Sequence, residues 1–144
     1  MEHYLALFEP DRESGGYVVT FPDFGYGVTQ GETEREAMEM AQDLLTLTIG
    51  DYIREGKPLP APSRRRRANF RAVPLSALQC AKVELYTAFV NSGFKKAEYA
   101  RRIGIPKTHV ERLFSLRHRS RLDQIEAAFA ALGKHLDIEV RDAA

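Results

Sequence analysis

The stretch KKAEYARRIGIPKTHVERLF, residues 95–114, decides how the C-terminal half of the chain folds. Apolar residues and cations recur through it at helical spacing, but Gly104 and Pro106 stand near its middle. Inside a helix a glycine costs roughly 1 kcal/mol and a proline about 3 kcal/mol, so one continuous helix is disfavoured. The sequence therefore predicts two short helices, over residues 96–103 and 106–115, with Pro106 in the first turn of the second, where proline is tolerated.

The apolar positions around Gly104 match the spacing of a helix-turn-helix unit. Two short helices pack closely only if a small residue stands four positions before the turn glycine, and Ala100 stands there. The unit also needs apolar residues beside the glycine and six and nine positions beyond it, and here these are Ile103, Ile105, Val110 and Leu113. A helical hairpin that never touches DNA has the same packing needs, so this second interpretation stays open.

In a helix-turn-helix unit the second helix enters the major groove, and its N-terminal side chains reach the edges of the bases. Arg112 and Lys107 suit the O6 and N7 acceptors of guanine, and Glu111 suits cytosine or the orientation of Arg112. The candidates for base contacts are Lys107, Thr108, His109, Glu111 and Arg112. Phosphate contacts set affinity and salt dependence, and nearby cations suit that role: Lys96, Arg117, Arg119 and Arg121.

Helical patterns flank this unit on both sides. Residues 76–93 and 122–132 carry apolar side chains at helical spacing, and each run ends at a glycine. The stretch LDIEV, residues 136–140, alternates apolar and polar side chains and predicts a final strand. Because a single unit grips DNA weakly and a dimer reads two half-sites, we expect a homodimer or higher homo-oligomer. Pairing of the final strand across a two-fold axis is a hypothesis for that assembly.

The first part of the chain has the pattern of a small sheet covered by a helix. Between the third and fourth predicted strands lie the signals of a helix: Thr33 and Glu36 form a T-x-x-E capping box, and Gly56 with Pro58 ends the helix that follows. Segment 57–69 is proline-rich and holds four arginines, either as a solvated linker or as a contact to DNA phosphates. Short β-branched and apolar runs predict the strands, at residues 4–8, 17–21, 28–31 and 70–75.

These elements predict an α+β protein with two domains. Residues 1–75 form a βββαβ domain, and residues 76–144 form an all-α helix-turn-helix domain that ends in the strand. Charge divides along the chain as well. Residues 1–62 hold 4 Lys or Arg and 12 Asp or Glu, a balance of −8, whereas residues 63–144 hold 17 and 8, a balance of +9. Such a division predicts two surfaces, one for a polyanion and one for a basic protein.

Composition excludes several other classes of protein. Cys80 is the only cysteine, so neither an internal disulfide nor a cysteine cluster for zinc can form. His109 and His118 stand in no metal-ligand motif, and we expect neither a metal nor a cofactor. No apolar run approaches the ~20 residues of a membrane helix, and the N-terminus lacks a signal-peptide pattern. The sequence therefore predicts a cytoplasmic protein without a membrane partner.

Two stretches of the chain, residues 15–45 and 85–133, together resemble one known family. Through Ala100, Gly104 and LRHRSRLDQIE (116–126), residues 85–133 resemble the helix-turn-helix end of many HicB-type antitoxins of bacterial type II toxin–antitoxin systems. The family often reads Pro-Asp-x-Pro-Gly-Cys after the second strand, but PDFGYG (22–27) here lacks the second proline and the cysteine. Residues 15–45 resemble the N-terminal domain of the family through Gly16-Tyr17, Phe21-Pro22-Asp23, Thr29-Gln30-Gly31 and the T-x-x-E-A start of the helix (33–37).

The resemblance implies a partial ribonuclease-H-like fold without nuclease activity in the N-terminal domain. It implies a non-enzymatic protein that binds a HicA-type toxin, an mRNA-cleaving ribonuclease with a catalytic histidine, and keeps that site from RNA. The C-terminal domain of such proteins dimerises and represses the operon's own promoter through double-stranded operator DNA. We expect toxin contacts in the turn that departs from the family pattern, at Asp23, Phe24 and Tyr26.

Two other functions fit parts of the sequence. An active ribonuclease-H-like enzyme needs carboxylates that converge on two metal ions ~3.5–4 Å apart, and the available Glu9, Asp11 and Asp23 form no evident convergent set. A ligand-responsive helix-turn-helix repressor without a toxin partner needs a pocket in the N-terminal domain. Its lining would be aromatic side chains, which at alternating strand positions more often form the core: Phe8, Phe21, Phe24 and Tyr26.

Overall fold

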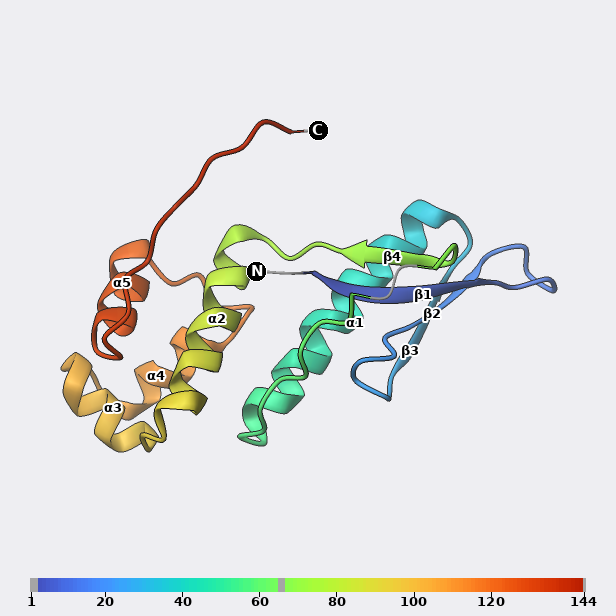
Figure 1. Cartoon of the computed structure of the whole chain (residues 1–144). Coiled ribbons are helices and arrows are strands. Elements are labelled where there is room, and N and C mark those ends of the chain that lie inside the picture. Colours follow the sequence, from blue (N-terminus) through green and yellow to red (C-terminus); the bar gives the residue numbers. More distant parts are fainter. Residues whose placement is uncertain (1–2, 65–66, 144) are drawn as a thin grey trace. The chain divides into compact units, whose positions relative to one another are not determined.

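A computed structural model describes residues 3–64 and 67–143 of the chain. The chain divides into two compact units between Cys80 and Ala81. The predicted α+β class is confirmed, and unit 1 has the predicted order of strand, strand, strand, helix, strand (Figure 1). Within the described residues, no helix is both long and apolar enough to cross a membrane. Arg65 and Arg66 of the arginine run lie outside the described residues.

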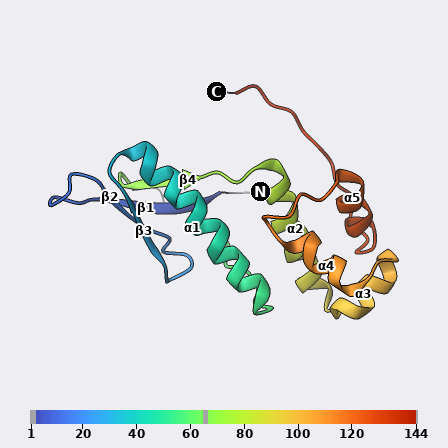
Figure 2. The same cartoon turned by 180° about the vertical axis from the view of Figure 1, so that it is seen from behind.

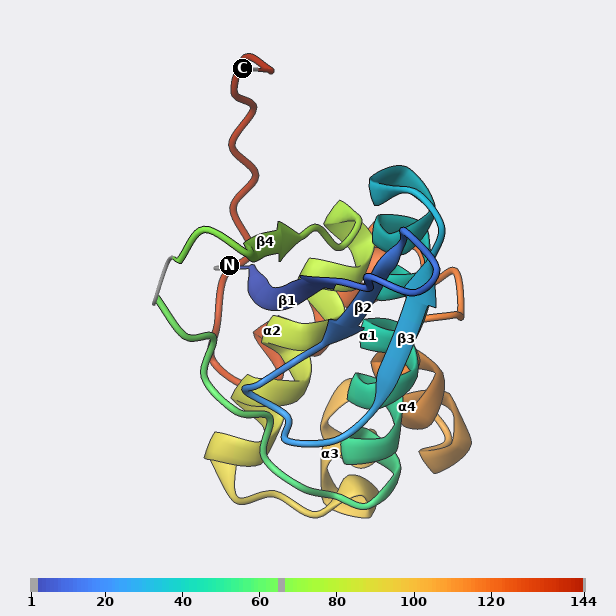
Figure 3. The same ribbon diagram turned by 90° about the vertical axis from the view of Figure 1, so that its right-hand side faces the viewer.

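Unit 1 contains a four-stranded antiparallel sheet with the strand order β3-β2-β1-β4. Figure 3 shows β1, β2 and β3 side by side. Phe8 lies opposite Val19, and Tyr4 lies opposite Val73. Alternate side chains of a strand share a face, so these four buried residues lie on one face of the sheet. The strands are β1 (Tyr4–Pro10), β2 (Tyr17–Thr20), β3 (Val28–Gly31) and β4 (Phe70–Val73).

Helix α1 (Glu34–Arg54) packs on that buried face of the sheet (Figure 1). It begins with a variant of the predicted capping box: the Thr33 hydroxyl accepts from the Glu36 N–H at 3.1 Å, whereas the Glu36 carboxylate accepts at 3.2 Å from the N–H of Glu32, one residue before the N-cap residue Thr33. Two of its sheet-facing residues are alanines, which let the helix lie close to the strands. The buried apolar residues recur at helical spacing: Ala37, Ala41, Leu45, Ile49 and Ile53.

The segment between α1 and β4, residues 57–69, is tied to unit 1 at several points. The Tyr4 hydroxyl donates to the Pro60 carbonyl at 2.7 Å, and the Ser63 N–H donates to the Asp23 carboxylate at 2.8 Å. Close to β4, the Phe8 N–H donates to the carbonyl of residue 69 at 2.8 Å. The described part of this segment is therefore bound to unit 1 and is not solvated along its whole length.

Unit 2 packs its helices, seen from behind in Figure 2, around a cluster of aromatic rings. The ring centroid of Phe89 lies 5.1 Å from that of Tyr99 and 5.0 Å from that of Phe114. The buried Tyr99 hydroxyl donates to the Ala128 carbonyl at 2.6 Å, which satisfies its polar end. Each helix lies within two residues of its predicted bounds: α2 (Ala77–Ser92), which begins in unit 1, α3 (Lys96–Ile103), α4 (Lys107–Phe114) and α5 (Leu122–Ala130).

The predicted strand at residues 136–140 is not formed in the single chain. Residues 134–143 join no helix or strand and run out from the end of α5 (Figure 1). Ile138 and Val140 are 67% and 91% exposed. A strand needs a neighbour to receive its backbone hydrogen bonds, and the alternation of side chains in this segment cannot supply one.

Two glycines allow the backbones of neighbouring elements in unit 1 to touch. A Cβ atom on Gly31, at the end of β3, would lie 2.3 Å from the Ala37 nitrogen and 2.6 Å from the Ala37 Cα. A Cβ atom on Gly16 would lie 2.3 Å from the Gly31 carbonyl oxygen. These neighbours are backbone atoms, which cannot rotate away. Gly31 therefore lets α1 begin directly on β3, and Gly16 lets the chain just before β2 lie against the end of β3.

We expect Gly31→Ala to lower the free energy of unfolding of unit 1 by about 2–3 kcal/mol, because the added methyl overlaps the α1 backbone. Gly50→Ala is the matched control, since Gly50 lies inside α1 and its new Cβ would meet only the Arg54 guanidinium, at 3.6 Å. That change should raise stability by about 0.5–1 kcal/mol. Thermal unfolding of the three proteins measures both signs, and equal effects of the two changes would contradict the close contact.

Candidate functional site

The turn between α3 and α4 depends on the conformation of Gly104. Its φ of 84° and ψ of 34° lie in the left-handed region, which glycine adopts without steric cost. The N–H groups of Gly104 and Ile105 donate to the Ala100 carbonyl at 2.9 Å and 3.0 Å. These bonds close α3 with a left-handed cap. Pro106 then takes the N-cap position of α4, one residue before the helical position predicted for it.

Helix α4 buries one side and exposes the other. Ala100, Val110 and Leu113 are each 4% exposed or less, and Ile103 and Ile105 are half-buried, so all five apolar positions of the predicted unit face its interior. The residues predicted to reach base edges are all exposed, and they all belong to this one helix: Lys107, Thr108, His109, Glu111 and Arg112. One helix therefore presents the predicted base-reading side chains to solvent.

The candidate DNA-binding cations fall into two groups, those with an ion-pair partner and those without one among the described residues. Lys96 Nζ lies 3.8 Å from the Glu111 carboxylate, so Glu111 is oriented toward α3 and not toward Arg112. Arg121 pairs with Asp123 at 3.4 Å. Such exposed pairs are weak, and an external phosphate can replace them. Four further cations have no ion-pair partner within the part of the chain that the structure describes: Lys107, Arg112, Arg117 and Arg119.

A buried lysine holds the two parts of this surface together. Lys82, in α2, is 0% exposed, and its ammonium donates to the Arg112 backbone carbonyl at 2.8 Å and to the Ser120 hydroxyl at 2.9 Å. Arg112 lies in the last turn of α4, where a cation is favoured by the helix dipole. Ser120 lies in the loop of residues 115–121, which carries the candidate phosphate-binding arginines. Burial lowers the pKa of Lys82 to about 8.

The sequence reading missed Lys82, although one signal for it was present. Lys82 stands four residues before Tyr86 and seven before Phe89, and both aromatic residues are buried in unit 2. A lysine in register with the buried side of a helix is expected to be buried with it. Because lysine is almost never fully buried without a partner, the spacing also implied a group for its ammonium to bind.

The turn after β2 brings only part of the predicted toxin-binding residues to the surface. Phe24 is 5% exposed, and its ring packs edge-on against Tyr52 with 5.3 Å between centroids. Tyr26 is 48% exposed, and its ring stacks parallel to that of Tyr52 with 6.1 Å between the ring centroids. Asp23 already accepts the backbone bond from residue 63. The turn therefore presents Tyr26, which Phe24 and Tyr52 support.

The structure does not bring together the groups that the two alternative functions need. Phe8, Phe21 and Phe24 are each 5% exposed or less, so these residues fill the core and do not line the predicted aromatic pocket. The Asp11 carboxylate accepts from the Ser14 hydroxyl at 2.8 Å within its own turn, and this bond lowers the pKa of Asp11. Among the described residues, no group of three His, Cys, Asp or Glu side chains could hold a metal ion.

Residues 3–84 match the model of a family described as HicB_like antitoxin of bacterial toxin-antitoxin system. The chain is 42% identical over 136 residues to Antitoxin HicB of Escherichia coli (strain K12), covering 94% of this chain and 96% of that protein. It is 36% identical over 137 residues to Antitoxin HicB 1 of Photorhabdus laumondii, covering 95% and 86%. It is 31% identical over 113 residues to Antitoxin HicB of Pseudomonas fluorescens (strain Pf0-1), covering 78% and 77%.

The shifted pKa of Lys82 makes the stability of unit 2 depend on pH. The ammonium loses its proton near pH 8 in the folded chain and near the ordinary value of 10.5 in the unfolded chain. Between these values the unfolded state holds more protons, so stability rises with pH. From about pH 7 to about pH 9.5 we expect the wild type to gain about 2 kcal/mol relative to Lys82→Met, which lacks the titrating group.

Urea unfolding followed through the methyl resonances of Val110, which is fully buried in unit 2, measures this difference. Burial also raises the pKa values of Tyr86 and Tyr99, which lowers stability above about pH 10 in both proteins and stays outside the chosen range. The Lys82 side-chain resonances of the wild type should titrate near pH 8. Parallel pH curves for the two proteins would contradict the buried charge.

Proposed function

The chain belongs to the HicB-like antitoxin family, and from that membership we propose that it neutralises a HicA-type mRNA-cleaving toxin and represses its own operon by binding operator DNA. The antitoxin role is that of its relatives. The class of toxin and the operator are the proposal. One observation supports it most: the chain combines an acidic N-terminal part with a helix pair whose exposed side is lined by cations.

The exposed side of α4 suits the major groove. Lys107 stands in its first turn and Arg112 in its last turn, and both are exposed without an ion-pair partner among the described residues. An arginine in this setting can donate two parallel hydrogen bonds to guanine O6 and N7. Arg117 and Arg119 follow in the loop that Lys82 fixes to α4, so base contacts and phosphate contacts have a defined spacing.

The N-terminal part suits a basic partner. A toxin that binds mRNA needs cations on its surface, and residues 1–62 have a balance of −8. Opposite charge on two partners speeds their encounter and disfavours wrong partners. Exposed Tyr26 offers an aromatic contact at this surface, since aromatic residues are enriched where protein interfaces are buried. Asp23 and Phe24 then act mainly by shaping the turn that carries Tyr26.

The exposed C-terminal segment suits pairing between two copies of the chain. Antiparallel pairing centred on Glu139 sets Ile138 opposite Val140 of the second copy, and Asp137 opposite Arg141 of the second copy. Centring on Ile138 instead sets Asp137 opposite Glu139 on both sides, which makes two like-charge pairs, whereas the Glu139 centre has one, between the two copies of Glu139, and two Asp137–Arg141 pairs of opposite charge. Like charges directly opposite are destabilising, and opposite charges are stabilising. We therefore place the two-fold axis at Glu139. This pairing supplies the backbone partner that the single chain lacks.

Co-purification tests the proposed function directly. The product of the neighbouring gene, tagged and expressed with this chain, should retain it in a stoichiometric complex and should be toxic when expressed alone. Arg112→Ala should weaken specific operator binding by ~1–3 kcal/mol and leave toxin binding unchanged. Arg117→Ala, the control, should weaken specific and non-specific DNA alike and reduce the salt dependence. Loss of both DNA and toxin binding in Arg112→Ala would show that the residue is structural.

A change in the C-terminal segment tests the dimer. Ile138→Asp places a carboxylate where an apolar side chain of the second copy should pack, so it should weaken dimerisation at least tenfold. Ile138→Val keeps an apolar, β-branched side chain and should leave dimerisation nearly unchanged. Sedimentation equilibrium over a range of concentrations measures both constants. Equal dimerisation of the wild type and Ile138→Asp would place the dimer interface elsewhere.

A further inference from the structure

The sheet of unit 1 has a free edge along β3. The Asp11 N–H donates to the Gly16 carbonyl at 2.8 Å, so these two residues are a hydrogen-bonded pair. In an antiparallel pair of strands, hydrogen-bonded and non-hydrogen-bonded pairs alternate. In the β1–β2 register the next hydrogen-bonded pairs are therefore Glu9 with Val18 and Leu7 with Thr20. The residues of β2 between those pairs, Tyr17 and Val19, bond to the other neighbour, β3. The N–H and C=O groups of their partners Gly31 and Thr29 therefore point to β2. The N–H and C=O groups of Val28 and Gln30 then point away from the sheet. No strand of the described chain lies on that side of β3.

Apolar side chains flank this free edge on both sides. Val28 projects from β3 on the face opposite α1 and is 65% exposed. On the α1 side, Met40 and Leu47 are 39% and 51% exposed. Leu44 stands at the helical spacing between them, and it lies at the edge, since a Cβ on Gly27 would be 3.2 Å from its Cδ1. The apolar side of α1 thus extends beyond β3, the strand at that edge of the sheet.

The exposed large hydrophobic residues of unit 1 are not scattered. Those that the structure describes there are Tyr26, Val28, Met40 and Leu47. Val28 belongs to β3, Tyr26 lies two residues before it, and Met40 and Leu47 lie on the side of α1 next to β3. Together with Leu44 we call these residues the β3-edge surface. A fifth strand added along β3 would place alternate side chains against α1 and beside Val28. The exposed groups of this surface are therefore those that an additional strand would cover.

We propose that a strand of the toxin pairs with the free edge of β3 and packs its α1-facing side chains on Met40, Leu44 and Leu47. The proposal rests on the proposed function, because it names the place where the toxin of that function binds. Addition of a strand to an exposed sheet edge gives affinity through backbone bonds and specificity through alternate side chains. Here the backbone groups of Val28 and Gln30 supply the bonds, and the α1 flank supplies the apolar contact.

Charge around the β3-edge surface favours a basic partner over a second copy of this chain. Glu36 and Asp43 are exposed on the same side of α1 as Met40 and Leu47, and in the described residues neither has a cationic partner. A second copy would bring identical carboxylates to face them. The predicted strand of another copy and the two residues after it, 136–142, are also acidic, with Arg141 against three carboxylates: Asp137, Glu139 and Asp142.

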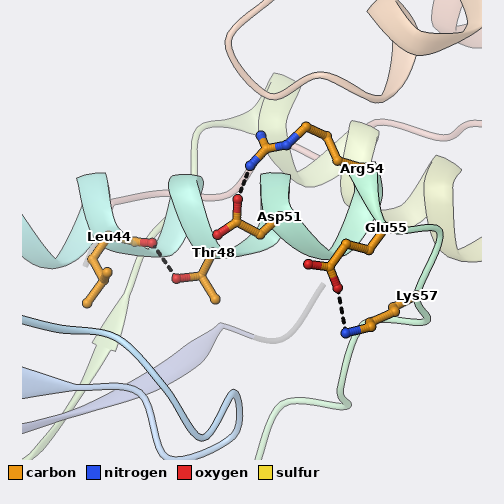
Figure 4. Close-up of polar contacts among 6 residues, drawn as sticks. All are labelled: Leu44, Thr48, Asp51, Arg54, Glu55 and Lys57. Carbon is orange, nitrogen blue, oxygen red and sulfur yellow. Dashed lines mark hydrogen bonds and ion pairs between the residues drawn. The ribbon is translucent and has the colours of Figure 1, made fainter.

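The end of α1 shows how the remaining carboxylates are neutralised within the chain. Figure 4 shows Asp51 paired with Arg54, and Glu55 paired with Lys57. The Thr48 hydroxyl is also satisfied within the helix, where it donates to the Leu44 carbonyl at 2.8 Å. Among the carboxylates of α1, those that the described residues leave without a cation therefore lie beside Met40 and Leu47, and not at the C-terminal end of the helix.

Amide hydrogen exchange on the complex tests strand addition residue by residue. The toxin, with its catalytic histidine replaced by alanine, is added to the full chain. The amides of Val28 and Gln30 should exchange quickly in the free chain and at least tenfold more slowly in the complex. Thr29 and Gly31, which pair with β2, should be protected in both states. A complex that forms while Val28 and Gln30 still exchange freely would overturn the inference and leave the proposed function standing.

A matched pair of substitutions tests the apolar contact. Leu47→Lys and Leu122→Lys each place a cation at an exposed leucine, 51% and 49% exposed respectively, and neither side chain belongs to a core. Leu47→Lys should weaken toxin binding at least tenfold, and Leu122→Lys, in unit 2, should leave it unchanged. Equal binding by both variants would overturn the inference. If the wild type fails to bind the toxin, the proposed function itself is wrong, and the inference falls with it.

Discussion

Direct contact between the backbones of β3 and α1 sets the geometry of unit 1. Gly31 has no side chain to hold the two elements apart, and Ala37 and Ala41 let the helix stay close along the sheet. A helix seated this low over the outermost strand cannot bury its whole apolar side. Its flank projects past β3, and Met40 and Leu47 are exposed there. One close contact therefore accounts both for the core and for the β3-edge surface.

Unit 2 depends on a buried charge in a comparable way. Taking an ammonium out of water is costly, and the hydrogen bonds from Lys82 to α4 and to the following loop offset that cost only in part, which its lowered pKa reflects. An apolar residue would pack more cheaply but would leave two acceptors without donors. In return, the chain holds Arg112 and the loop arginines in one arrangement. Rigid spacing of this kind is what a surface that contacts both bases and phosphates needs.

Most of the fold could be predicted from interactions between residues that are close in the sequence. The turn at Gly104 follows from glycine and proline penalties, and the start of α1 follows from the Thr33 capping box, so both could be read from a few neighbouring residues. Features that depend on distant partners could not. Lys82 is explained by a carbonyl 30 residues away, and the stretch at residues 136–140 has a strand pattern without a strand beside it. A surface position is predicted for Phe24 because it stands in a turn, and the turn sequence does not show that the distant ring of Tyr52 packs against its side chain.

The composition of the free edge has a consequence for solubility. Sheet edges usually carry charged residues that discourage pairing with other chains, but the four residues of β3, VTQG, carry none. The nearest protection is the repulsion between the carboxylates of Glu36 and Asp43 on approaching copies. Salt screens such repulsion beyond a Debye length of about 8 Å at physiological ionic strength. We therefore expect self-association of the unbound chain through this edge to increase as ionic strength rises, and to stop once a partner occupies the edge.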